Sequence, residues 1–229
     1  MNNKLAWIII LFLLFCLSLV AQNNTDSLYV NFKPVFGKVP LELTKKYSSN
    51  KDTLTIETFK CYISNIEIQY KDNSYFIQEN SHHLLDLTKS DSFKIPTTKN
   101  NDKLISKISF TIGIDSVTNN SGALSGDLDP INGMYWAWQS GYINMKVEGK
   151  SPSCPTRKNE FQFHIGGYLD PNYAMRKVAI DVNKKEVDIA IDLKEFFFNI
   201  NLHKTNSIMI PCKAAMELAN ISVKMFYAE

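Results

Sequence analysis

The 229-residue chain has almost no excess of charge of either sign. Lysine and arginine number 25 against 23 aspartates and glutamates, which leaves a formal net charge of +2. Such a balance gives no electrostatic reason to expect nucleic acid or a charged membrane surface as a partner. Long apolar runs are also missing after residue 20, so nothing in the body of the chain predicts a membrane-spanning helix. We therefore expect neither a nucleic-acid-binding protein nor an integral membrane protein.

The one long apolar run stands at the start of the sequence. Residues 5–20 are almost entirely apolar, follow Lys4, and end at Ala21 before a polar stretch. These are the parts of a secretory signal peptide, and the run is shorter than the roughly 20 residues that a spanning helix needs. A retained N-terminal anchor is the alternative. We expect residues 1–21 to be a cleaved signal peptide and residues 22–229 to form one domain in the periplasm or outside the cell.

Cysteine is scarce. Apart from Cys16 in the apolar run, the chain has only Cys61, Cys154 and Cys212, and their spacing fits no zinc knuckle or redox pair. An odd number outside the cytoplasm implies one disulfide and one free thiol, or three thiols. Cys154 and Cys212 both adjoin prolines in loop-like sequence, so a disulfide between them is the favoured pairing. Cys61 lies in a strand-like run and is expected to be a small buried apolar residue.

Helical patterns are scarce as well, and the dominant signal is period-two alternation rich in β-branched and aromatic residues. A single helical turn at 194–198 and a short helix at 211–218 are the helical candidates, and 116–133 is expected to be a long, functional loop. The sum predicts an all-β domain, an antiparallel β-sandwich or Greek-key barrel with at most one or two short helices. Strands are expected at residues 28–35, 59–70, 75–77, 83–87, 104–114, 142–148, 160–165, 177–182, 186–193 and 221–227.

Familiar catalytic motifs are missing. The sequence has no Gly-x-Ser-x-Gly nucleophile elbow, and no His-Glu-x-x-His or His-x-His pattern. Asp127 and Asp129 could bind calcium, but they lack the full oxygen-ligand pattern of an EF-hand loop. We therefore expect a binding protein and no enzyme activity.

The most unusual run present is residues 132–142, Asn-Gly-Met-Tyr-Trp-Ala-Trp-Gln-Ser-Gly-Tyr. On an extended backbone, Trp136 and Trp138 project from one face and Ala137 from the other. Paired indoles can fill a core, form a stacking platform, or act as a redox-active pair, and core packing is their ordinary role. The long polar loop just before the motif weighs against packing alone, because loops carry sites on rigid scaffolds.

Imidazole is the commonest side-chain metal ligand and suits copper and zinc. His164 stands in Phe-Gln-Phe-His-Ile-Gly-Gly, on the strand face opposite the two phenylalanines, and the glycine pair permits close backbone approach. Adjacent histidines on a strand point to opposite faces and cannot easily share a metal. A lone strand histidine is more often structural, so spacing alone does not establish a site. Histidines occur at positions 82, 83, 164 and 203.

Together these motifs resemble one known family, the MbnP-like proteins, periplasmic proteins first associated with methanobactin operons. The Trp-x-Trp motif and the His-x-Gly-Gly motif are the specific part, and the resemblance runs over nearly all of residues 22–229. The segments that carry it occur in this order: 32–37 (FKPVFG), 61–68 (CYISNIEI), 122–124 (GAL), 133–142 (GMYWAWQSGY), 163–167 (FHIGG) and 203–209.

The resemblance implies an exported, β-rich, copper-binding protein of copper homeostasis. It further implies that a tryptophan of the Trp-x-Trp motif is oxidised to kynurenine by a partner, a di-haem enzyme similar to the MauG-type peroxidases. Carried over residue by residue, Trp136 or Trp138 is the modified position, and His164 and His203 are the ligands. Opening an indole ring yields an aryl amine and a ketone, and nitrogen donors of this kind suit copper.

Two further ligands and one different function remain open. His83 could replace His203, and Met134 could add a thioether to Cu(I), although methionine more often fills a core. The alternative function is a carbohydrate- or surface-binding β-sandwich module. It would use the Trp-x-Trp motif and Tyr142 as an aromatic stacking platform.

Overall fold

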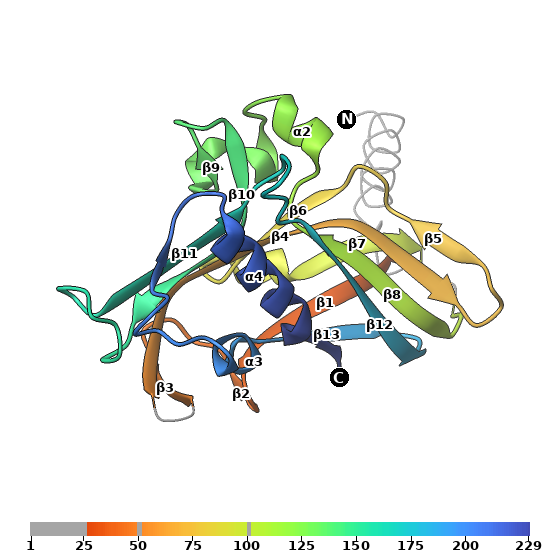
Figure 1. Cartoon of the computed structure of the whole chain (residues 1–229). Coiled ribbons are helices and arrows are strands. Elements are labelled where there is room, and N and C mark those ends of the chain that lie inside the picture. Colours follow the sequence, from red (N-terminus) through yellow and green to blue (C-terminus); the bar gives the residue numbers. More distant parts are fainter. Residues whose placement is uncertain (1–26, 50–51, 100–101) are drawn as a thin grey trace, which may run out of the picture.

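The computed structural model describes residues 27–49, 52–99 and 102–229 (Figure 1). The signal peptide expected over residues 1–21 lies outside this range and stays a prediction. Strands dominate and the helices are few and short, which confirms the expected mostly-β fold. Within the described ranges, no helix combines the length and the apolar character that crossing a bilayer requires.

Two mixed sheets form the body of the molecule. The smaller sheet has the order β15 (Phe226–Ala228), β13 (Val187–Asp192), β1 (Ser27–Phe36) and β2 (Val39–Pro40), and β7 (Lys94–Lys99) also pairs with β1. The larger sheet has the order β12 (Arg176–Lys184), β8 (Ile105–Ile112), β4 (Asp52–Tyr70), β10 (Gly141–Lys150), β11 (Glu160–Gly166) and β14 (Ser207–Ile208). Strands β3 (Lys46–Ser49), β5 (Tyr75–Ile77) and β6 (His82–Asp86) pair with β4, and β9 (Tyr135–Trp136) pairs with β10. The β1–β13 and β11–β14 ladders are parallel, whereas the other ladders among these strands are antiparallel.

The long strand β4 connects the parts of the larger sheet. Its first half pairs with β10 and its second half with β8. Between the halves the register shifts at Ser64 to Glu67, and Asn65 has a φ of 52°. This bulge lets one strand turn and serve two sets of partners.

Aromatic side chains of β11 close the main core against a helix. Phe161 packs edge-on against Phe197, and Phe163 packs against Phe196, both on helix α3 (Leu193–Phe198). Helix α4 (Lys213–Ser222) confirms the short helix expected from residue 211 and also contacts β11. The strand expected at 221–227 is shorter than predicted. Residues 218, 219 and 222 continue a buried helical face, so the chain becomes extended only at β15.

The segment from 116 to 133 is not a plain loop. It contains α2 (Ser116–Asn120) and the 3₁₀ turns η2 (Gly126–Leu128) and η3 (Pro130–Asn132). With β9 it covers the outer face of the larger sheet at the end that Figure 1 shows at the top. A second apolar cluster is buried beneath it, formed by Tyr62, Leu84, Ile114, Leu128, Met134, Trp136, Tyr142 and Ile143.

The expected Cys154–Cys212 disulfide is not formed, and all three cysteines described are free. Cys154 lies in the turn before β11, whereas Cys212 follows Pro211, which packs against Gly167 just past the other end of that strand. Seven strand residues span about 20 Å, whereas a disulfide needs Cα atoms within roughly 7 Å. The two proline-flanked loops did not predict the cysteine pairing correctly, because they lie at opposite ends of β11.

Candidate metal centre

The Trp-x-Trp motif forms a tight hairpin. Trp136 pairs with Gly141 in the β9–β10 ladder, and residues 137–140 make the turn, in which Ser140 has a φ of 53°. Trp138 is therefore in a turn and not on the extended backbone expected from the sequence. Its ring still lies near that of Trp136, with centroids 6.2 Å apart at an angle of 52°, because the turn folds the chain back.

The two indoles differ sharply in exposure. Trp136 is only 6% exposed, whereas Trp138 is 64% exposed. Trp136 is buried because its ring lies against the backbone of Gly166. A Cβ built on that glycine would lie 2.8 Å from Cζ3 of Trp136 and 2.7 Å from the carbonyl oxygen of Tyr142. The His-x-Gly-Gly motif thus has a steric reason for its first glycine.

The three-ring stacking platform of the alternative function is not formed. Tyr142 is 1% exposed, and its hydroxyl is bonded to Leu124 N and to the carbonyl oxygens of Gly122 and Leu128. With Trp136 buried as well, Trp138 alone presents an indole face to solvent. The prediction of this platform was wrong because Trp136 and Tyr142 are both buried in the second apolar cluster.

His164 projects from β11 onto the outer face of the larger sheet, the face that residues 116–133 and β9 cover. It is 7% exposed, and its Nε2 lies 2.7 Å from Oε1 of Glu148 on β10. The hydrogen bond from His164 holds the pKa of Glu148 at about 2, assisted by the side chain of Thr58 and opposed by burial. Across the described part of the chain, no hydrogen-bond partner reaches Nδ1 of His164. The imidazole is therefore fixed at one nitrogen and free at the other.

Alternation along β11 brings His164 and Trp136 together. His164 and Gly166 are two residues apart and face the same side of the sheet, so they lie about 7 Å apart along the strand. Because the Trp136 ring covers Gly166, it lies on the same face of β11 as the imidazole, two residues further along the strand. His164 and the residue that Trp136 covers thus share one face of β11, and the ring of Trp138 lies beside that of Trp136.

A row of polar residues extends from His164 across the sheet. Lys60 Nζ lies 2.9 Å from the buried carboxylate of Asp86 and donates to the Asn132 carbonyl at 2.9 Å. Lys146 Nζ donates to the Gly133 carbonyl at 2.6 Å, and burial lowers the pKa of this lysine. The two lysines therefore anchor residues 132 and 133, the entrance of the tryptophan hairpin, to the larger sheet. The row consists of directly paired residues on β6, β4, β10 and β11: Asp86, Lys60, Lys146 and His164.

Sequence reasoning missed these lysines and did not place Glu148 beside His164. Their signal was present in the alternation of β10, where residues 146 and 148 interrupt an otherwise buried strand with charges on one face. Cross-strand register, which the sequence does not supply, was needed to place them beside His164.

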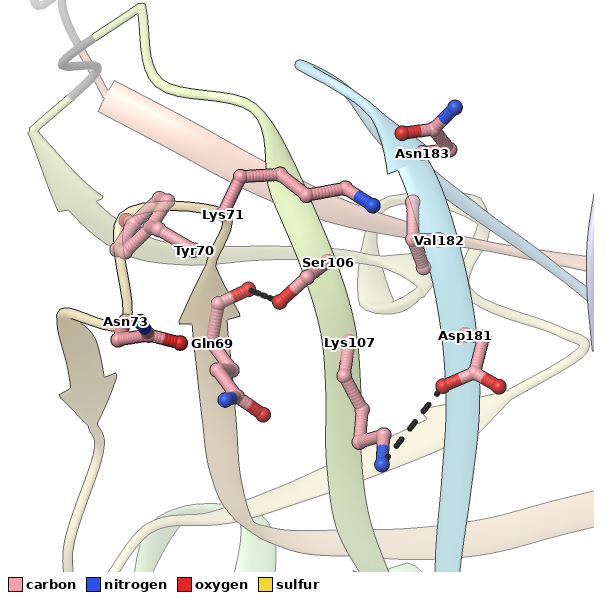
Figure 2. Close-up of a pocket in the computed structure, with 9 residues that line it drawn as sticks. All are labelled: Gln69, Tyr70, Lys71, Asn73, Ser106, Lys107, Asp181, Val182 and Asn183. Carbon is pink, nitrogen blue, oxygen red and sulfur yellow. Dashed lines mark hydrogen bonds and ion pairs between the residues drawn. The ribbon is translucent and has the colours of Figure 1, made fainter.

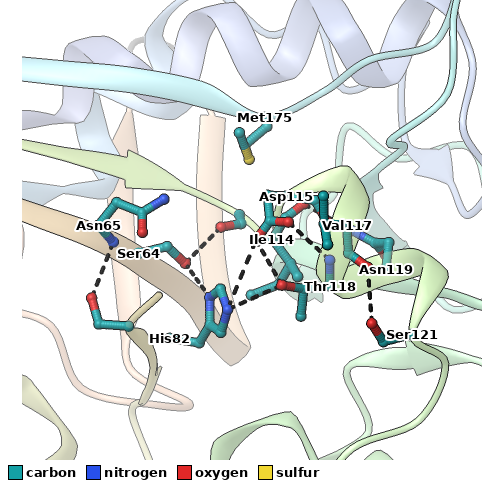
Figure 3. Close-up of polar contacts among 12 residues, drawn as sticks. Ser64, Asn65, His82, Ile114, Asp115, Val117, Thr118, Asn119, Ser121 and Met175 are labelled. Carbon is teal, nitrogen blue, oxygen red and sulfur yellow. Dashed lines mark hydrogen bonds and ion pairs between the residues drawn. The ribbon is translucent and has the colours of Figure 1, made fainter. Parts of the chain in front are cut away.

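His82 has a structural role. Its Nδ1 lies 3.0 Å from Ser64 Oγ, and its Nε2 lies 3.3 Å from Thr118 Oγ1 and 3.8 Å from Asp115 Oδ2 (Figure 3). Asp115 also caps α2 by accepting from Thr118 N at 2.8 Å. Burial of the ring lowers the pKa of His82, opposed by the charge of Asp115. The contacts attach α2, and with it the covering segment, to β4 and β6.

The remaining predicted ligands do not join His164. His203 is exposed in the chain after α3 and lines a pocket with Asp52 and Ser153. That pocket lies at the start of β11, on the side to which Phe161 and Phe163 point. His83 contacts Gln78 Oε1 at 3.1 Å through Nε2, on the face of β6 opposite Leu84. Met134 is fully buried in the second apolar cluster.

Nowhere in residues 27–49, 52–99 and 102–229 do three His, Cys, Asp or Glu side chains cluster as a metal site would require. His164 nevertheless has the arrangement typical of a metal-binding histidine, with one ring nitrogen held by a carboxylate and the other available. Asp127 and Asp129 were considered as calcium ligands. One carboxylate oxygen of each already accepts a hydrogen bond, from Leu84 N and Ile131 N respectively.

A larger pocket, of about 650 Å³, lies elsewhere, between the β4–β5 turn, β8 and β12 (Figure 2). Its lining includes the Lys107–Asp181 ion pair at 3.7 Å and a hydrogen bond from Ser106 Oγ to the Gln69 carbonyl. None of its nine lining residues is His, Cys or Trp. It therefore offers neither imidazole nor thiolate to a soft or borderline metal, and the candidate centre is the one at His164.

The fold and this site define a class: two mixed β-sheets whose outer face, covered by a tryptophan hairpin, presents one carboxylate-held histidine. A model of the MbnP family matches residues 25–210, and the chain belongs to that family. Its structure also resembles that of MbnP from Methylosinus trichosporium, with a TM-score of 0.55 over 76% of this chain and 77% of that one. At 12% identity this likeness shows the fold alone. No curated protein sequence matches the chain.

Proposed function

We propose that this protein binds copper through His164 and a tryptophan of the hairpin that is oxidised to kynurenine. The observation that carries the proposal is the His164 imidazole, held by Glu148 at Nε2 and open at Nδ1, on the same face of β11 as Gly166, which the Trp136 ring covers. Membership of the MbnP family supports it. The protein acts in copper homeostasis outside the cytoplasm, after removal of residues 1–21, and it is the substrate of a modifying enzyme and not itself an enzyme.

Glu148 prepares the imidazole for the metal. An ionised carboxylate at Nε2 keeps the proton on that nitrogen and leaves the lone pair on Nδ1, and such support raises the basicity of a ligand. Because the pKa of Glu148 is held at about 2, the carboxylate stays charged at any physiological pH. Imidazole alone is a weak site. The aryl amine and ketone of a kynurenine would supply the donors that an intact indole lacks, and copper accepts such nitrogen and oxygen donors.

The oxidant comes from outside the chain. The sequence contains no Cys-x-x-Cys-His haem attachment motif. A di-haem, MauG-like peroxidase is the proposed partner. The 64% exposure of Trp138, beside the buried Trp136, supports access of such an enzyme to the hairpin.

The test is a copper titration of protein purified from its native host, with His164→Ala and His203→Ala as a matched pair. Loss of the ligand His164 should weaken copper binding by about tenfold or more. His203→Ala should bind copper as the wild type does, because that residue lies at the other end of β11. Equal weakening in both variants, or none in His164→Ala, would contradict the proposal, and denaturant unfolding of each variant excludes loss of fold as the cause.

A further inference from the structure

A second pocket, of about 520 Å³, opens on the smaller sheet at the point where the partner strand of β1 changes. Strand β1 pairs with β7 up to Asn31 and with β2 from Val35 onward. Residues 32–34 belong to neither ladder, although β13 pairs with them on the other side. The 3₁₀ turn η1 (Ser90–Phe93) and Leu87 just before it also line the pocket. The cavity is therefore bounded by β1, β2 and η1, which carry none of the residues of the candidate metal centre.

Apolar side chains form most of the pocket wall. Three of them, Phe32, Leu41 and Phe93, are buried in the main core. A cavity of roughly 300–1,000 Å³ with mainly apolar walls and a few polar groups is the ordinary form of a small-molecule site. The other apolar members of the wall are half-buried or exposed and present apolar surface to the pocket: Pro34, Val35, Pro40 and Leu87.

The charged residues at the pocket leave one cation unpaired. Lys33 Nζ lies 2.8 Å from Oε2 of Glu229 and 2.8 Å from Oδ2 of Asp188, so it is already held by carboxylates. Lys38 is exposed and makes no ion pair with any residue that the structure describes. The lining thus carries two lysines against one carboxylate, and that carboxylate is held by Lys33. An anion at the pocket therefore meets a free ammonium group on Lys38.

We propose that this pocket binds a small amphipathic anion, with its apolar body against the wall and its carboxylate on Lys38. The inference goes beyond the proposed function and does not depend on copper. Burial of the apolar body supplies the free energy of binding, and the lysine supplies the preference for an anion. The N–H of Gly37, whose φ is 66°, donates to Asp192 Oδ1 at 2.7 Å. This bond fixes the turn from which Lys38 extends.

The open edge of β1 does not favour a peptide strand as the occupant. Strand addition relies on a row of backbone hydrogen bonds, and only residues 32–34 lie outside the two ladders. The carbonyl of Pro34 already accepts from Leu41 N at 3.0 Å, and a proline has no N–H to donate. An acyl chain or a compact apolar body needs no such bonds, so it fits the wall better than a peptide does.

The experiment titrates the protein with decanoate and follows the methyl groups by NMR. The pocket methyls are those of Val35, Leu41 and Leu87, which line the cavity. The control methyls are those of Val117 and Leu124, which are exposed on the covering segment over the larger sheet. Octanoate tests the dependence on chain length, and decyltrimethylammonium presents a similar apolar body with the opposite charge.

Three variants locate the site. Lys38→Glu reverses the charge at the mouth, and Lys204→Glu is its matched control, because Lys204 is an exposed lysine on the chain before β14 and does not line this pocket. Ser90→Trp places a large side chain at an exposed position of the lining. Urea unfolding of each variant checks that the fold is retained.

Decanoate should shift the pocket methyls and leave the control methyls in place. Binding should weaken by about fivefold or more in Lys38→Glu, be lost in Ser90→Trp, and keep its wild-type strength in Lys204→Glu. Octanoate should bind about tenfold more weakly than decanoate, because two fewer methylene groups are buried. Decyltrimethylammonium should bind more weakly than decanoate by about fivefold or more.

Equal binding of decanoate and decyltrimethylammonium would overturn the proposal, as would equal weakening in Lys38→Glu and Lys204→Glu. Shifts that spread over the control methyls, or unchanged binding in a folded Ser90→Trp, would also overturn it. If Ser90→Trp does not fold, the methyl shifts and Lys38→Glu decide. None of these measurements involves copper, so failure here leaves the proposed function standing.

Discussion

The ring of Trp136 lies against the backbone of Gly166, so closely that a Cβ at position 166 would come within 2.8 Å of ring atom Cζ3. This contact sets the distance between the tryptophan hairpin and β11. It also places the indole on the face of β11 that carries His164, because residues 164 and 166 share a face of the strand. The Trp-x-Trp and His-x-Gly-Gly motifs therefore pack directly against each other and form one structural unit.

Gly166→Ala should disturb that unit. The added methyl group meets both the Trp136 ring and the Tyr142 carbonyl, so the hairpin must shift, at a cost of about 2–3 kcal/mol in the free energy of unfolding. Tryptophan fluorescence should move to longer wavelength as Trp136 becomes wetter. The control is Gly126→Ala, where a Cβ would find open space and only a φ of +67° opposes it. An unchanged emission spectrum in Gly166→Ala would contradict the contact.

Glu148→Gln should change the acid stability of the protein. The pKa of Glu148 is lowered from 4.5 to about 2 by its bond from His164. The stabilisation is fully present above the unfolded-state value near 4.5 and is lost as the pH falls towards 2, since the unfolded chain binds the proton first. The variant should lose about 2 kcal/mol at neutral pH and show a flatter decline between pH 4.5 and 2.

The matched control for Glu148 is Glu57→Gln, an exposed carboxylate paired with Lys150 on the same sheet. An exposed pair of this kind contributes little, so the acid limb of this variant should follow that of the wild type. Urea unfolding at a series of pH values measures both. Parallel curves for Glu148→Gln and the wild type would show that the His164–Glu148 bond stores no such energy.

Lys60→Met should loosen the entrance of the tryptophan hairpin. Lys60 neutralises Asp86, whose side chain is only 3% exposed, and bonds the Asn132 carbonyl. Removing one partner of a buried pair costs about 3 kcal/mol. Lys150→Met, which breaks an exposed pair with Glu57, should cost under about 1 kcal/mol. Unfolding free energies and limited proteolysis near residues 130–140 report the difference, and equal losses would contradict the anchoring role of Lys60.

Three thiols should be found in the folded domain. Cys61, Cys154 and Cys212 are free, and only Cys212 is partly exposed. Alkylation of the denatured protein without reductant should label all three, and alkylation of the native protein should label Cys212 first, because burial raises the pKa of the Cys61 and Cys154 thiols and the thiolate is the reactive form. Labelling of only one cysteine, rising to three after reduction, would instead show that two of the cysteines form a disulfide.

Patterns that depend on local sequence were predicted well. Alternation located most strands, and the short helix expected from residue 211 is present as α4. The Trp-x-Trp and His-x-Gly-Gly motifs were recognised as parts of one site. Each of these signals is carried by neighbouring residues, whose preferences act before the chain folds.

Features that depend on register and long-range packing were not predicted. His203 was paired with His164, yet the two lie at different ends and faces of β11, and the contact between Glu148 and His164 was not predicted. The prediction of a platform of three aromatic rings was wrong because residues 116–133 fold over the sheet and bury Tyr142. No periodicity within a segment contains that information.

The central claim is that an indole of the hairpin, on the face of β11 that carries His164, becomes a copper donor by oxidation. Peptide mass spectrometry of residues 108–146 from protein purified from its native host tests it most directly. The account predicts that the peptide carries kynurenine, a net loss of one carbon and gain of one oxygen, at Trp136 or Trp138. Two unmodified tryptophans in protein from cells that express all its partners would contradict it.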